Sequence, residues 1–151
     1  KLTVRSAQPP RRKSHVSAGR KSVLVMGDEA SIPSLAVNMI SFLGHDVEVV
    51  SDGTAAVEKY QRALNKGQPF GAVILDLVVP GGIGAREAVE RLRKIDPTVN
   101  AIVVSGYAQD PVMVDYRDFG FKGVIGKPFT LEELQKTLNS VLVESQQWTV
   151  H

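Results

Sequence analysis

The chain has 151 residues, with 18 Lys and Arg against 16 Asp and Glu, and a formal net charge of +2. This length suits one domain with a sizeable core and is too short for a catalytic domain beside a separate regulatory one. The lack of cysteine excludes disulfides, thiolate zinc sites and thiol nucleophiles. No apolar run approaches the roughly 18 residues of a membrane helix, so we expect no direct membrane insertion.

Basic charge is concentrated at the start of the chain. Residues 1–21 contain seven basic side chains and no acidic one, so residues 22–151 carry a net charge of −5. The segment mixes Pro, Ser, Gly and like charges without apolar periodicity, which predicts a flexible linker. It has neither aromatic interleaving nor the apolar stretch of a secretory signal, and we expect no nucleic-acid partner.

From Ser22 onward, short apolar runs alternate with amphipathic segments. The runs have the length and composition of buried strands, and the segments have the periodicity of helices. The predicted strands are 22–26, 46–50, 72–75, 101–104 and 123–125. The predicted helices are about 32–43, 54–65, 85–95, 111 to about 119, and a last one that follows a capping box at 130–133.

The apolar residues of these helices recur on one face, which is expected to point to the core. The first helix presents Ile32, Leu35, Ala36, Met39, Ile40 and Leu43, and the second presents Ala56, Tyr60, Ala63 and Leu64. The last presents Leu131, Leu134, Leu138, Val141 and Leu142. Residues 145–151 are expected to form a C-terminal tail.

Five consecutive βα units with apolar strands predict a parallel sheet covered by helices on both faces. We expect an α/β, flavodoxin-like, doubly wound (βα)5 three-layer sandwich with the strand order 2-1-3-4-5. In such folds the ligand site lies at the carboxyl ends of the strands.

Polar side chains follow four of the predicted strands. Asp28 comes after the first, Asp76 after the third, Ser105 after the fourth and Lys127 after the fifth. The order 2-1-3-4-5 makes the first and third strands neighbours, so the two carboxylates should face each other and repel unless a cation lies between them. Carboxylates, a carbonyl and waters are the ligands of Mg²⁺, and a hydroxyl and an ammonium can stabilise a phosphoryl oxygen.

Four motifs carry a specific resemblance. V-L-V-M-G-D-E (23–29), V-I-L-D-L-V-V-P-G-G-I-G (73–84), V-V-S-G-Y-A (103–108) and G-V-I-G-K-P-F-T (123–130) resemble the receiver domain of two-component response regulators. The resemblance spans residues 22–144. The chain is similar in particular to receiver domains at the C-terminal end of bacterial hybrid sensor histidine kinases, a placement that fits a basic, Pro-containing linker before the domain and no output domain after it.

The resemblance implies a role for each residue of the constellation. Asp76 is expected to be the phosphoacceptor, a carboxylate nucleophile that takes the phosphoryl group of a phosphohistidine. Asp28, Asp76 and the backbone carbonyl of Val78 are expected to ligate Mg²⁺. Ser105 matches the switch hydroxyl and Lys127 the ammonium that pairs with a phosphoryl oxygen, and the Lys127-Pro128 bond is expected to be cis.

The resemblance also implies partners and a compartment. The partner would be a histidine kinase or a histidine phosphotransfer protein, and the domain would be cytoplasmic even where a parent kinase is anchored in a membrane. A receiver catalyses its own phosphorylation and the hydrolysis of its aspartyl phosphate without being a conventional enzyme. The oligomeric state stays open.

Two residues depart from the family pattern. Receivers carry two adjacent acids after the first strand, whereas Gly27 here precedes Asp28 and Glu29. The lost acid would contact a metal-bound water, so we expect weaker Mg²⁺ binding, with Glu29 compensating in part and indirectly. Val124 stands where families with an aromatic switch carry Tyr or Phe, which predicts a muted conformational change.

Three alternatives to a phosphoacceptor can be compared with the residues that follow the first strand. Gly27 supports a pseudo-receiver, a binding module with impaired metal binding that exchanges no phosphate. A hydrolase of the haloacid dehalogenase type would need an Asp-x-Asp motif after the first strand, where the chain has Gly27-Asp28-Glu29. A dinucleotide or flavin binder would need a glycine-rich phosphate loop there, and the chain has none at that place.

Overall fold

The computed structural model describes residues 20–27 and 33–150. Within them one parallel sheet has the strand order β2-β1-β3-β4-β5. The strands are β1 Ser22–Met26, β2 Asp46–Val50, β3 Ala72–Asp76, β4 Ala101–Ser105 and β5 Gly123–Gly126. The predicted doubly wound, flavodoxin-like sandwich and its strand order are confirmed.

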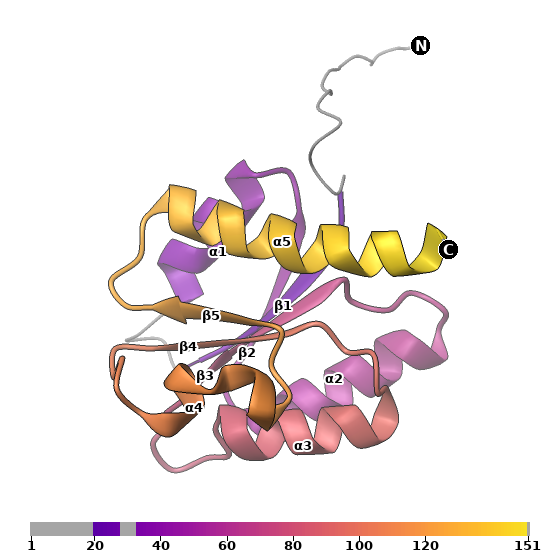
Figure 1. The fold of residues 1–151 in the computed structure, drawn as a ribbon. Helices are drawn as coiled ribbons and strands as arrows, with labels where there is room; N and C mark the ends of the chain where they lie inside the picture. Colours follow the sequence, from indigo (N-terminus) through magenta and orange to yellow (C-terminus); the bar gives the residue numbers. More distant parts are fainter. Residues whose placement is uncertain (1–19, 28–32, 151) are drawn as a thin grey trace.

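Helices cover both faces of this sheet (Figure 1). On one face lie α1 Pro33–Phe42 and α5 Leu131–Val150. On the other lie α2 Gly53–Asn65, α3 Ala85–Ile95 and the short α4 Pro111–Val114, which the 3₁₀ turn η3 Tyr116–Phe119 follows. The sheet is therefore the middle of three layers, and only its strand ends and edges reach the surface.

The core consists of two clusters, one on each face of the sheet, because successive strand residues point to opposite sides. In β1, Leu24 and Met26 pack toward α2 and α3, and Val23 and Val25 pack toward α1 and α5. These four side chains have no exposed surface. The cluster on the side of α1 and α5 also contains the predicted inward residues Leu134, Leu138, Val141 and Leu142.

Helix ends follow the predicted local signals. In the capping box before α5, the N–H of Glu133 donates to Thr130 Oγ1 and the N–H of Thr130 donates to Glu133 Oε1. Asp110 caps α4 by accepting the N–H of Val112 at 2.9 Å, with Pro111 at the first helical position. These caps fix where the two helices begin after β4 and β5.

Two predictions about the helices are wrong in detail. The helix expected from Pro111 to about Phe119 ends at Val114, and the chain continues from Asp115 as a 3₁₀ turn. Four of the nine residues, Val112, Val114, Asp115 and Asp118, have low helix propensity, so the length of the helix depends on how the following turn packs. On α1, Leu35 is 53% exposed, although the periodicity assigns it to the buried face.

The two ends of the chain are described in part. The expected linker lies outside the described residues except for Arg20 and Lys21, and Arg20 pairs with Asp46 at 2.6 Å. At the other end, α5 continues to Val150 through residues that the sequence assigns to a tail. In the described part of the chain, no helix is both long and apolar enough to cross a membrane.

Candidate functional site

The carboxyl ends of the parallel strands meet at one edge of the sheet. Asp76, the last residue of β3, is in register with Val104, so Ser105 lies one position further along β4. Ser105 is in register with Gly126, which places Lys127 directly after β5. The sheet therefore brings together three predicted site residues that lie far apart in the sequence.

Asp76 and Lys127 form an ion pair at this edge. Asp76 is 3% exposed, and its Oδ2 lies 3.6 Å from Lys127 Nζ. Its Oδ1 accepts the backbone N–H of Val78 at 3.2 Å. A buried carboxylate needs hydrogen bonds and a compensating charge, and Val78 and Lys127 provide both. The arrangement keeps a buried carboxylate at the end of β3 with a cation beside it.

Ser105 is buried next to this pair. It is 2% exposed, and its Oγ accepts the backbone N–H of Tyr107 at 3.0 Å. Its carbonyl accepts the backbone N–H of Lys127 at 2.9 Å, and the Lys127-Pro128 peptide is cis, as predicted. This backbone hydrogen bond fixes the start of the segment after β5 beside the end of β4, so the residues that carry the hydroxyl and the ammonium are directly linked.

The first strand contributes the other side of the edge. β1 lies beside β3, and Gly27, which follows β1, donates its N–H to the carbonyl of Val50 at 3.1 Å. Asp28 and Glu29, the predicted metal ligands of this segment, lie outside the described residues. Their positions relative to Asp76 therefore stay predictions.

The described residues provide part of an oxygen-donor set. The carboxylate of Asp76 and the backbone carbonyl of Val78 are of the type that Mg²⁺ prefers. The 3.6 Å between Asp76 Oδ2 and Lys127 Nζ exceeds hydrogen-bond length, so the two groups form an ion pair without a direct hydrogen bond. Residues 20–27 and 33–150 contain no group of three His, Cys, Asp or Glu suited to a metal. The donor chemistry fits Mg²⁺, with Asp28 as the further predicted ligand.

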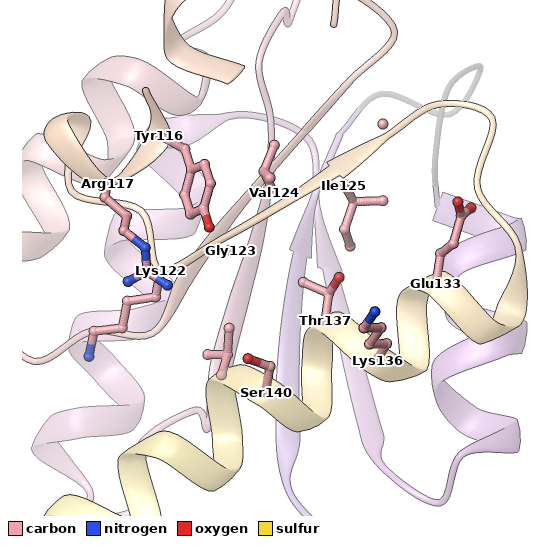
Figure 2. A pocket seen from close by; sticks show the side chains of 12 residues that line it. Tyr116, Arg117, Lys122, Gly123, Val124, Ile125, Glu133, Lys136, Thr137 and Ser140 are labelled. Atoms are coloured by element: carbon pink, nitrogen blue, oxygen red, sulfur yellow. The ribbon is translucent and has the colours of Figure 1, made fainter. Parts of the chain in front are cut away.

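A separate cavity of about 360 Å³ runs along β5. Figure 2 shows Tyr116 and Arg117 on one side of it and Lys136 and Ser140 of α5 on the other. Asp76, Ser105 and Lys127 do not line this cavity. It is therefore distinct from the edge that carries the predicted chemistry.

Val124 lies on the strand that borders this cavity, where the family pattern allows an aromatic residue. It is half-buried and packs against the core cluster of the α2 and α3 face. Phe121 is 1% exposed and belongs to the same cluster, whereas Tyr107 is 67% exposed. A muted switch through Val124 stays a prediction.

Motif reasoning missed two backbone contacts around the site. Tyr107 donates its N–H to Ser105, and Gly53 donates its N–H to the carbonyl of Ile83 at 2.7 Å. The motifs S-G-Y-A and V-V-P-G-G-I-G signal loops in the sequence. They do not reveal the contact between Gly53 and Ile83, because it joins two different βα units.

The sequence comparisons agree with this geometry. A family model described as the response regulator receiver domain matches residues 23–139. The chain is 29% identical over 125 residues to the sensor kinase CckA of Brucella abortus, covering 83% of this chain and 13% of that protein. It is 31% identical over 125 residues to the transcriptional regulatory protein TrcR of Mycobacterium tuberculosis, covering 82% of this chain and 46% of that protein. The chain thus spans less than half the length of either relative.

Solved structures show the same fold. The receiver domain of the sensor histidine kinase PA1611 from Pseudomonas aeruginosa has a TM-score of 0.72 at 23% identity, covering 83% of this chain and 99% of that one. The chemotaxis protein CheY4 of Vibrio cholerae has a TM-score of 0.71 at 26% identity, covering 82% of this chain and all (100%) of that one.

Proposed function

The chain belongs to the response regulator receiver domain family, and from this premise we propose that it accepts a phosphoryl group from a phosphohistidine onto Asp76 in the presence of Mg²⁺. The observation that carries the proposal is the buried Asp76 carboxylate at the end of β3 with Lys127 Nζ 3.6 Å away. This pairing of a buried carboxylate with a cation supports a nucleophile and a charge partner for the transferred group.

The transfer is a displacement at phosphorus. One carboxylate oxygen of Asp76 forms the new O–P bond, while the P–N bond of the phosphohistidine breaks and its electron pair stays on the imidazole nitrogen. Lys127 holds a phosphoryl oxygen through its positive charge, and the Ser105 hydroxyl donates to another. Because the reacting charge develops on the phosphoryl oxygens, these two preplaced donors lower the barrier.

Mg²⁺ would be held by Asp28, Asp76 and the backbone carbonyl of Val78, with Glu29 acting through water. When bound, the ion neutralises charge on the phosphoryl oxygens. In the crystal structure of the PA1611 receiver domain, a magnesium ion is coordinated in the active site cleft. That observation on a similar fold, together with the oxygen donors at Asp76 and Val78, supports the same ion here.

The partner would be a histidine kinase or a histidine phosphotransfer protein. Sensor kinases among the similar proteins support a placement of this domain within a hybrid kinase, whose cytoplasmic part would carry it. In that setting the domain would pass its phosphoryl group onward to a partner protein.

Intact-mass spectrometry after incubation with acetyl phosphate and Mg²⁺ tests the proposal. We expect the mass of one phosphoryl group on the wild type, no gain in Asp76→Asn, and an unchanged gain in the matched control Asp118→Asn, since Asp118 is exposed on η3. A wild type that gains no mass would favour the pseudo-receiver.

A further inference from the structure

The loop of residues 77–84 joins the phosphoacceptor strand to α3 and lies against the first turn of α2. The N–H of Gly53, the first residue of α2, donates to the carbonyl of Ile83 at 2.7 Å. A Cβ on Gly53 would lie 2.6 Å from Ile83 Cγ2 and 2.9 Å from the Ile83 carbonyl oxygen. The backbone of α2 and this loop therefore touch with no room for a side chain between them.

A second contact lies beside the first. A Cβ on Gly82 would lie 2.9 Å from Asp52 Cβ. Asp52 is the N-cap of α2, and its Oδ1 accepts the N–H of Ala55 at 3.0 Å. The loop thus packs against the N-terminus of α2, which Asp52 already caps.

The start of the loop is held at the phosphoacceptor. Val78 donates its N–H to Asp76 Oδ1, and Val79 is only 9% exposed within the core. A Cβ on Gly84 would lie 2.6 Å from the carbonyl oxygen of Leu77, so the two ends of the loop also touch each other. Val78, which is 52% exposed, is thus held between anchored neighbours.

We propose that the hydrogen bond from Gly53 to Ile83 is a positioning clamp, by which the β2–α2 junction sets where Val78 lies relative to Asp76. The clamp rests on the proposed phosphoacceptor function. It assigns a part in that function to Gly53, which lies outside the strand ends. Gly53 and Ile83 act through the loop and do not touch the phosphoryl group. A displacement of about 1 Å at such a loop can slow a reaction about 100-fold.

Gly53→Ala tests the clamp, with Thr54→Ala as the matched control. Thr54 is the next residue of the same helix turn and is exposed, so its variant changes the helix without touching Ile83. We expect the rate of Asp76 phosphorylation by acetyl phosphate to fall about tenfold or more in Gly53→Ala and to stay at the wild-type value in Thr54→Ala. Thermal unfolding should show that both variants are folded at the assay temperature.

Amide hydrogen exchange on the metal-free protein gives a readout independent of phosphorylation. The first N–H groups of a helix have no partner within the helix. The Gly53 amide should nevertheless exchange slowly in the wild type, because it donates to Ile83. In Gly53→Ala, the amides of residue 53 and of Val78 should both exchange faster.

The outcomes separate the clamp from the function on which it rests. A wild type that is not phosphorylated overturns both. A phosphorylated wild type with an equally fast Gly53→Ala overturns only the clamp, and so does a wild-type Gly53 amide that exchanges as fast as an unbonded one. The exchange result holds even if Gly53→Ala fails to fold.

Discussion

The Lys127 ammonium lies 3.6 Å from the buried Asp76 carboxylate, across the ends of two strands that are not neighbours. β4 separates them, and its last residue, Ser105, accepts the backbone N–H of Lys127. The ion pair therefore depends on the order of the strands in the sheet, since no local stretch of sequence brings these two side chains together.

Lys127→Met should slow Asp76 phosphorylation about 100- to 1,000-fold, the loss typical of removing one group that stabilises charge in a transition state. The rate with acetyl phosphate and saturating Mg²⁺ measures it. Lys136→Met is the control, because Lys136 is exposed on α5. Equal rates in wild type and Lys127→Met would show that the ammonium does not contact the phosphoryl group.

Gly27→Asp should tighten Mg²⁺ binding about 10- to 100-fold, because the new carboxylate restores a hydrogen bond to a metal-bound water. Calorimetric titration of both proteins with Mg²⁺ measures the change. If the two bind Mg²⁺ equally well, Gly27 is not the cause of a weakened site.

His45 should make stability depend on pH between neutral and mildly acidic conditions. It is 8% exposed, and its Nδ1 accepts the N–H of Lys21 at 3.1 Å. Burial lowers the pKa of His45, and the charges of Arg20 and Lys21 lower it further against the opposing effect of Asp46. The folded protein therefore resists a proton that the unfolded chain accepts below about pH 6.5.

The free energy of unfolding should thus be fully retained above about pH 6.5 and should fall as the pH drops toward the lower folded pKa. Urea unfolding of wild type and His45→Gln at neutral and mildly acidic pH measures this. The decline should be smaller in His45→Gln, and an identical decline in both proteins would refute the role of His45.

Tyr60→Phe should destabilise the fold by about 1 kcal/mol. Tyr60 is 2% exposed and donates its hydroxyl to Asp96 Oδ2 at 2.6 Å. Burial and this hydrogen bond raise the pKa of Tyr60 above its usual range. Tyr116→Phe, measured by the same urea unfolding, is the control, because Tyr116 lies on η3 with its ring under Arg117. Equal urea midpoints for Tyr60→Phe and wild type would show that the hydrogen bond to Asp96 does not stabilise the fold.

Most of the fold was predictable because its signals are local. Apolar runs such as 72–75 are too short for helices and too apolar for loops, and they become central strands. The end of α4 was not predictable, because the turn at Asp115 depends on how η3 packs against α3 and β5. The exposure of Leu35 has the same origin, since periodicity describes a face but not how far the neighbouring layer covers it.

The convergence of three candidate site residues at one edge of the sheet was predictable, and their chemical roles stay proposals. Asp76 and Ser105 end strands and Lys127 directly follows one, and the topology rule alone brings strand ends together. The contact of Gly53 with Ile83 was not, because it depends on the distance between two loops. The glycines of residues 81–84 signal close approach in the sequence but do not name the partner.

The central claim is that Asp76 carries the phosphoryl group, and borohydride trapping tests it most directly. The chain is treated with acetyl phosphate and Mg²⁺ and then with borohydride, which reduces an aspartyl phosphate to homoserine, and the modified residue is located by peptide mass spectrometry. The account predicts homoserine at position 76 and at no other carboxylate. Homoserine at another position, or none at all, would contradict it.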